Sequence, residues 1–152
     1  MNPANNHVTP IKAVIFDLDG TLLDTIQDIA DTMNIVLTNN NFPIHSIPTY
    51  EVFVGQGLEK LVWKVLPEQN RNQEMVENLI NSFRNIYPDR WINTRPYPKI
   101  NKTLSGLEKM NIQYGILSNK PHRFTVKIVE KYFPAHKFFH VRGANSDFPK
   151  KT

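Results

Sequence analysis

Hydrophobic residues follow two different spacings in the first part of the chain. Residues 12–17 (KAVIFD) contain an unbroken apolar run, which is typical of a strand buried on both faces of a parallel sheet. Residues 25–39 instead place Ile, Ala, Met and Leu side chains at helical spacing, and a run of three asparagines ends this pattern. The sequence therefore predicts a buried strand followed by an amphipathic helix.

The middle of the chain is predicted to be helical. Helical spacing of apolar residues recurs over residues 58–66 and 73–87, and no strand pattern interrupts it. A proline-rich stretch at residues 93–99 (NTRPYPK) then suits a domain boundary.

Helical and strand patterns alternate after this boundary, in the order helix, strand, helix, strand, over residues 98–110, 112–117, 121–132 and 138–141. Such alternation favours an α/β core with parallel strands. We expect residues 1–24 and 96–152 to form this core, and residues 25–95 to form a helical insertion above it.

Composition narrows the class of protein. A chain of 152 residues suits one domain with a small insertion, and its net charge of +4 suits a phosphate-bearing partner. Basic residues form no stripe with interleaved aromatics, so we expect no nucleic-acid partner. There is no cysteine and no apolar run of about 18 residues, and residues 1–10 are polar. We therefore expect a cytoplasmic protein without a membrane span.

Two carboxylates follow the first predicted strand directly. Asp17 and Asp19 are two positions apart, and burying two like charges is costly unless a cation compensates them. Ser118 ends the second predicted strand, at the sheet edge where ligands of parallel sheets bind. Gly20 allows a turn that brings backbone N–H groups toward an anion.

This layout suits phosphoryl transfer. A carboxylate can act as a nucleophile and become an aspartyl phosphate, while Mg²⁺ offsets the charge of carboxylates and phosphate together. A second carboxylate can protonate the leaving oxygen and later activate water. The carboxylate pair therefore predicts a magnesium-dependent reaction at a phosphate ester.

Several short motifs resemble one known family. Residues 17–22 (DLDGTL), after an apolar strand, resemble the first motif of the haloacid dehalogenase superfamily. Residues 118–121 (SNKP) are similar to a signature of its phosphoglycolate phosphatases, and residues 54–58 (VGQGL) and 95–98 (RPYP) resemble the cap loop and cap exit of that subgroup. The resemblance implies a Rossmann-like parallel sheet with an inserted helical cap.

The resemblance also implies residue roles. Asp17 is the expected nucleophile and a magnesium ligand, and Asp19 is the expected acid and base, which also gives Mg²⁺ its backbone carbonyl. The expected phosphate- and substrate-binding residues are Gly20, Thr21, Ser118, Asn119, Lys120, Lys151, Gly55 and Gly57. Among them, Lys120 is expected to contact a substrate carboxylate, and the two glycines of the cap loop let that loop approach the core.

The family pattern is incomplete near the end of the chain. The third motif is a lysine, for which Lys150 and Lys151 are both candidates; we choose Lys151, although Thr152 stands where proline is usual. The fourth motif, an acidic pair after another strand, is absent, and Asp147 does not replace it. We therefore expect the C-terminal part of the core to be missing, the metal site and activity to be weakened, and a free apolar sheet edge to favour a homodimer.

The sequence thus predicts a magnesium-dependent phosphatase that hydrolyses a small phosphorylated metabolite through an aspartyl-phosphate intermediate. The resemblance puts 2-phosphoglycolate first among the substrates. The alternative is a non-catalytic binding or interaction protein that keeps the fold.

Overall fold

A computed structural model describes residues 10–145 and has a three-stranded parallel sheet in its core. The strands are β1 (Ala13–Phe16), β4 (Gln113–Pro121) and β5 (Val141–Ala144), in the spatial order β1-β4-β5. All pairs are parallel, with Ile15 opposite Gly115 and Ile116 opposite Val141. The α/β class predicted from the sequence is therefore confirmed.

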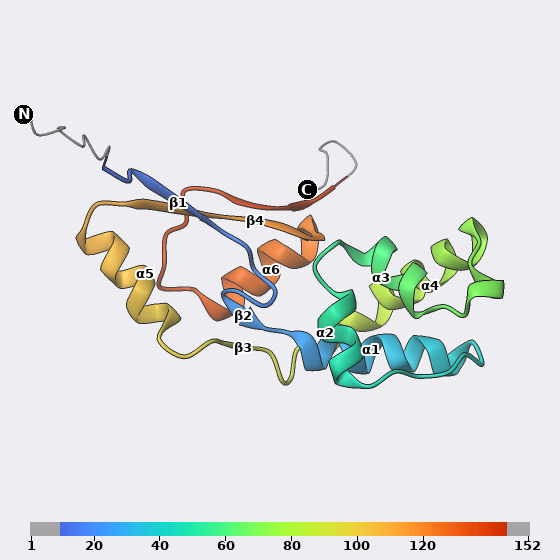
Figure 1. Ribbon diagram of the computed structural model, residues 1–152. Coiled ribbons are helices and arrows are strands. Elements are labelled where there is room, and N and C mark those ends of the chain that lie inside the picture. Colours follow the sequence, from blue (N-terminus) through green and yellow to red (C-terminus); the bar gives the residue numbers. More distant parts are fainter. Residues whose placement is uncertain (1–9, 146–152) are drawn as a thin grey trace, which may run out of the picture.

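Two helices cover one face of this sheet. Helices α5 (Ile100–Lys109) and α6 (His122–Tyr132) lie beneath β4 and β5 in Figure 1. Strand residues alternate between the two faces, so Ile116 is buried while Leu117 is 39% exposed. Ile15 on β1 is 54% exposed. Within residues 10–145, β1 has a single strand neighbour and is an edge of the sheet.

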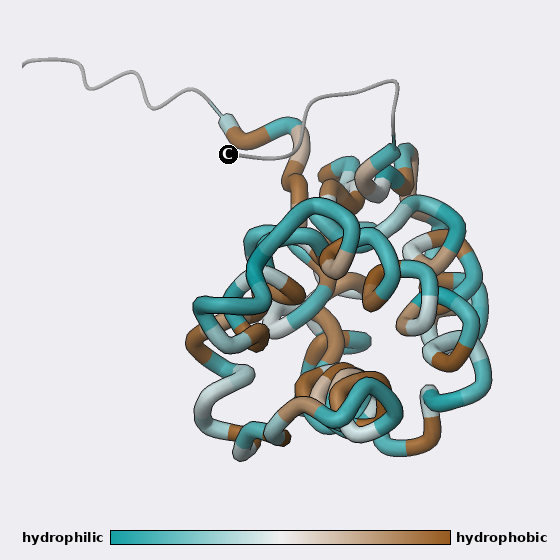
Figure 2. Tube along the Cα trace, turned by 90° about the vertical axis from the view of Figure 1, so that its right-hand side faces the viewer, coloured by the Kyte–Doolittle hydropathy of each residue, from teal (hydrophilic) through white to brown (hydrophobic). Residues whose placement is uncertain are grey.

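The chain between β1 and α5 is mostly helical and lies beside the core in Figure 1. Its four helices and two 3₁₀ turns are α1 (Ile26–Asn39), α2 (Ile47–Phe53), α3 (Leu58–Val65), η1 (Glu68–Asn70), α4 (Gln73–Ile86) and η2 (Tyr87–Asp89). Figure 2 shows hydrophobic and hydrophilic stretches alternating along these helices, as expected of elements that bury one face. Their buried residues include Met33, Val62, Leu79 and Phe83.

A short ribbon joins this insertion to the core. Strands β2 (Leu23–Asp24) and β3 (Arg95–Pro96) pair antiparallel, and the N–H of Tyr97 donates to the carbonyl of Leu22 at 3.1 Å. The chain therefore enters and leaves the helical insertion at adjacent points.

The last strand is shifted from its predicted place. Residues 138–141 were the expected strand, yet β5 begins at Val141. The ring of Phe138 packs edge-on against Tyr114 and Phe133 instead, with centroid distances of 5.0 and 5.9 Å. Phe138 therefore packs against the core before the strand begins, whereas Phe139 is 51% exposed.

Other elements differ in detail. Helix α2 was not predicted, because it has only seven residues and buries a single one, Tyr50. Strand β4 continues past the predicted end to Pro121, with an irregular register between Leu117 and Pro121. Among the described helices, none is long and apolar enough to cross a membrane.

Candidate functional site

A cavity of about 60 Å³ lies between the carboxyl ends of β1 and β4 and the helical insertion. Its floor is polar and comes from the core, with Asp17, Asp19 and Ser118 among its residues. Its other walls are largely apolar and include Leu58, Leu61 and Phe83 from the insertion. The cavity therefore pairs charged groups with a hydrophobic cover, which is common in ligand sites.

Most of the site residues predicted from the sequence meet at this cavity. The residues that line it are Asp17, Asp19, Ser118, Asn119, Lys120, Gly55 and Gly57. Gly20 and Thr21 are not among the lining residues and lie in the adjoining turn. Lys150 and Lys151 lie outside the described residues.

The turn after β1 holds the two carboxylates in place. Asp17 accepts a hydrogen bond from the N–H of Leu18 at 2.8 Å. Gly20 has a φ of +77°, which glycine adopts without strain. Its N–H donates to the carbonyl of Leu23 at 2.9 Å, so Gly20 closes the turn and this N–H is not directed to an anion.

Asp19 has a buried cation beside it. The ammonium nitrogen of Lys120 donates to Oδ1 of Asp19 at 3.0 Å and to Oδ2 at 3.3 Å, and the Lys120 side chain is 4% exposed. The hydroxyl of Thr25 donates to the same Oδ1 at 2.8 Å. The positive charge that the carboxylate pair requires is thus supplied in part by the protein itself.

Lys120 also contacts the insertion. Its ammonium nitrogen donates to the hydroxyl oxygen of Tyr87 at 2.6 Å. Burial lowers the pKa of Lys120, but Asp19 and Tyr87 outweigh burial, so this pKa lies above its ordinary value. Burial raises the pKa of Tyr87 to about 12, so the phenol is neutral near pH 7 and accepts the bond. Sequence analysis predicted neither of these partners of Lys120.

Strand β4 supplies the opposite side of the floor. Ser118 is buried, and its hydroxyl oxygen accepts a hydrogen bond from the N–H of Lys120 at 3.2 Å. The side-chain amide of Asn119 donates to the carbonyl of Gly55 at 2.9 Å, which ties the insertion loop to the end of β4. Gly57, with a φ of +90°, allows this loop to approach the core.

Sequence analysis missed a buried carboxylate outside the cavity lining, that of Asp28 on α1. Its Oδ2 accepts bonds from the N–H and the hydroxyl of Thr94 at 2.7 and 2.6 Å. Its Oδ1 accepts from the N–H and side-chain amide of Asn93 at 3.1 and 3.0 Å. The signal available in the sequence was an aspartate next to the buried Ile29 and Ala30 in the first turn of an amphipathic helix.

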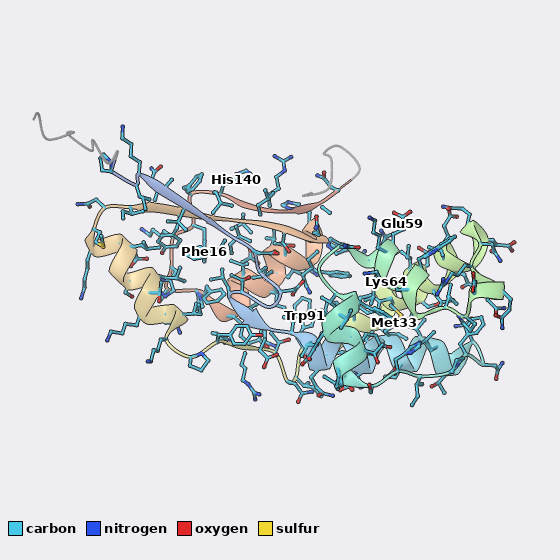
Figure 3. All side chains as sticks on the ribbon, viewed as in Figure 1. Phe16, Met33, Glu59, Lys64, Trp91 and His140 are labelled. Atoms are coloured by element: carbon cyan, nitrogen blue, oxygen red, sulfur yellow. The ribbon has the colours of Figure 1, made fainter. Side chains whose placement is uncertain are left out.

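Trp91 lies where the insertion meets the core (Figure 3). Its ring packs edge-on against Tyr87 and Phe124, with centroid distances of 5.9 and 6.5 Å. Tyr87 and Phe124 line the cavity, whereas Trp91 packs against both rings without lining it.

The oxygen atoms at the cavity suit a hard cation whose remaining coordination positions are filled by substrate or water. Mg²⁺ is commonly bound by one or two carboxylates together with substrate phosphate and water. Asp17 offers a carboxylate oxygen at the cavity, and the ligand expected from Asp19 is its backbone carbonyl, because Lys120 and Thr25 hydrogen-bond to its carboxylate. Residues 10–145 contain no cluster of three or more His, Cys, Asp or Glu side chains arranged to hold a metal. With so few protein ligands, a Mg²⁺ ion at this cavity would need further oxygen ligands from a phosphate group and water.

Together, the fold and the cavity define an α/β protein with a helical cover over a carboxylate-bearing site at the sheet's carboxyl edge. Comparison with known proteins gives the family. A family model described as haloacid dehalogenase-like hydrolase matches residues 14–151, and the chain belongs to this family.

Its relatives include curated phosphoglycolate phosphatases. The chain is 29% identical over 144 residues to the one from Pseudomonas savastanoi, covering 92% of this chain and 53% of the relative. It is 31% identical over 155 residues to the one from Neisseria meningitidis, covering 99% and 64%. A crystal structure of a predicted phosphoglycolate phosphatase from Haemophilus somnus is similar, with a TM-score of 0.83, 25% identity, and coverage of 94% and 66%. The chain therefore spans between half and two thirds of the length of these relatives.

Proposed function

We propose that this chain carries the reaction site of a magnesium-dependent phosphatase for small phosphate monoesters, with 2-phosphoglycolate as the first candidate substrate. The supporting observation is that Asp17 and Asp19, which follow β1, and Ser118 from β4 line one cavity under the helical insertion. The names of the relatives support the same class of substrate.

The proposed reaction has two steps. In the first, a carboxylate oxygen of Asp17 forms a bond to phosphorus, the bond from phosphorus to the ester oxygen breaks, and Asp19 gives that oxygen its proton. In the second, Asp19 takes a proton from water as the water oxygen attacks phosphorus, which releases phosphate and restores Asp17. A bound Mg²⁺, held by Asp17 and Asp19, would offset the negative charge on the phosphoryl oxygens.

Other residues orient the phosphoryl group in this proposal. The Ser118 hydroxyl and the backbone amide of Asn119 donate hydrogen bonds to phosphoryl oxygens. The start of α6, directly after Pro121 in the cavity wall, adds the positive end of a helix. The apolar cover limits access of water to the reacting groups.

The decisive experiment compares phosphate release by the wild-type chain and by Asp17→Asn, with 2-phosphoglycolate and p-nitrophenyl phosphate, with and without Mg²⁺. We expect weak magnesium-dependent turnover that Asp17→Asn lowers to background, because the nucleophile is lost. Asp31→Asn, the same change outside the cavity, should keep wild-type turnover. Absence of turnover, or turnover that survives in Asp17→Asn, would contradict the proposal.

A further inference from the structure

The ammonium group of Lys120 is held by two parts of the protein at once. Asp19 belongs to the turn after β1 in the core, whereas Tyr87 opens η2 at the end of the helical insertion. The ammonium nitrogen donates to both carboxylate oxygens of Asp19 at 3.0 and 3.3 Å and to the hydroxyl oxygen of Tyr87 at 2.6 Å. Lys120 is thus arranged as a bridge between core and insertion.

The ring of Tyr87 is fixed by packing that does not involve its hydroxyl. It stacks on Phe83 with a centroid distance of 4.8 Å and contacts Phe124 edge-on at 5.5 Å. Tyr87 is 1% exposed. The hydroxyl therefore reaches Lys120 at a set position, and the ring would stay in place without it.

We propose that Tyr87 is a positioning residue: its hydroxyl holds the Lys120 ammonium against Asp19, so Lys120 is the fixed partner of Asp19 and not a contact for a substrate carboxylate. A lysine side chain is flexible, and its ammonium needs more than one fixed partner to keep a single position. Through this bridge, the placement of Asp19 depends on the insertion being docked on the core. The consequence for catalysis rests on the proposed phosphatase function; the contact itself does not.

Tyr87→Phe removes the hydroxyl and keeps the ring, and Tyr50→Phe is its matched control. Tyr50 is also fully buried in the insertion, and its hydroxyl donates to Asn34 at 2.6 Å, away from the cavity lining. Both variants lose one buried tyrosine hydroxyl, but only Tyr87→Phe loses the hydrogen bond to Lys120; the cation–π contact of the ammonium with the ring, 4.6 Å from its centroid, is kept.

The first measurement follows the ammonium directly by ¹⁵N NMR of the lysine side chain, assigned through its proximity to the Tyr87 ring. We expect a slowly exchanging Lys120 ammonium signal in the wild-type chain. In Tyr87→Phe, its hydrogens should exchange at least about tenfold faster, because a charge-assisted hydrogen bond is lost. Exchange should be unchanged in Tyr50→Phe. Exchange within twofold of wild type in Tyr87→Phe would overturn the proposal.

The second measurement separates positioning from substrate binding. With p-nitrophenyl phosphate and Mg²⁺, Tyr87→Phe should lower kcat about tenfold and leave KM within about twofold, because Asp19 is misplaced while the substrate contacts remain. Lys120→Met, which keeps most of the stem, should lower kcat at least as far. The double variant should lose no more than Lys120→Met alone, because both changes break one bridge.

The outcomes distinguish the two proposals. Faster ammonium exchange in Tyr87→Phe without any turnover by the wild-type chain would contradict the proposed phosphatase function and support the bridge through Lys120. Wild-type kcat in Tyr87→Phe, or additive losses in the double variant, would remove the positioning role and leave the phosphatase function. If Tyr87→Phe does not fold, Lys120→Met alone decides: a kcat unchanged from wild type contradicts the role of the bridge.

Discussion

Asp28 carries the densest set of hydrogen bonds in the helical insertion and is 1% exposed. Asp28→Asn keeps the shape of the side chain but replaces one acceptor oxygen with a donor that faces N–H groups. We expect the free energy of unfolding to fall by about 2 kcal/mol, since bonds to a charged acceptor are lost and buried donors remain. Urea unfolding measures this loss. Asp31→Asn should stay within about 0.5 kcal/mol of the wild-type chain.

The environment of Glu108, away from the cavity, predicts that the stability of the fold depends on pH. Hydrogen bonds from Tyr114 and His136 hold its pKa below the ordinary value of 4.5. The ionised form is thus favoured by folding, so its contribution to stability is present above pH 4.5 and is lost as the pH falls through the lowered pKa.

The corresponding experiment compares Glu108→Gln with the wild-type chain in thermal unfolding across acidic pH. Glu108→Gln should be less stable at about pH 6, and the difference should shrink toward about pH 3. Glu130→Gln, at an exposed position on α6, should show no such trend. A gap that stays constant with pH would contradict the assigned hydrogen bonds.

At the residue scale, the sequence predicted which residues form the floor of the cavity better than it predicted the contacts among these residues. Asp17 and Ser118 could be placed because each follows a recognisable apolar strand, and the carboxyl ends of parallel strands share one edge. The bridge from Lys120 to Asp19 could not be predicted, because the two residues are 101 positions apart and their contact depends on the tertiary fold. The role of each residue in the reaction stays a prediction.

At the scale of elements, apolar patterns predicted the long segments well. Strand β1, helix α1 and helix α6 lie within one residue or so of their predicted bounds, because each buries a continuous face. The two-residue strands β2 and β3 carry no such pattern, since their pairing comes from the packing of the insertion against the core. Short elements were thus missed where tertiary contacts decide the local structure.

Strand β5 and helix α6 meet closely at Gly143. A methyl group added there would overlap the Thr125 hydroxyl, the Lys120 carbonyl and the Cα of His122, at 2.7 Å from the last of these. Gly143→Ala should lower the free energy of unfolding by about 1–3 kcal/mol, because strand and helix must separate. Gly106→Ala in α5 should raise the free energy of unfolding by about 0.5–1 kcal/mol, because the added methyl group meets no neighbouring atom within 4 Å. Urea unfolding of both variants tests this contrast.

At the scale of the whole molecule, the insertion closes over a cavity of about 60 Å³. A water-sized group needs about 10–15 Å³ of such space, so the cavity has room for about four to six groups of that size, which favours a small ligand. We expect kcat/KM for 2-phosphoglycolate to exceed that for nucleoside monophosphates by at least about tenfold. This ratio corresponds to a difference of about 1.4 kcal/mol in activation free energy. Leu58→Ala, which replaces a side chain of the cavity wall with a smaller one, should bring the kcat/KM values for the two substrates closer together. Equal kcat/KM values for both substrates would contradict this size limit.

The antiparallel pairing of Asp24 with Arg95 brings the two ends of the insertion next to each other. Paired residues of neighbouring strands lie about 5 Å apart, so a two-residue Asn-Gly turn is long enough to reconnect them after excision of residues 25–94. Asp28 would be removed together with its hydrogen-bond donors Asn93 and Thr94, so the excision leaves no member of this group without its partners. Recombination between related genes at these two points would therefore exchange the whole cover, provided that the new cover again supplies the hydroxyl groups that Thr25 and Tyr87 present to Asp19 and Lys120.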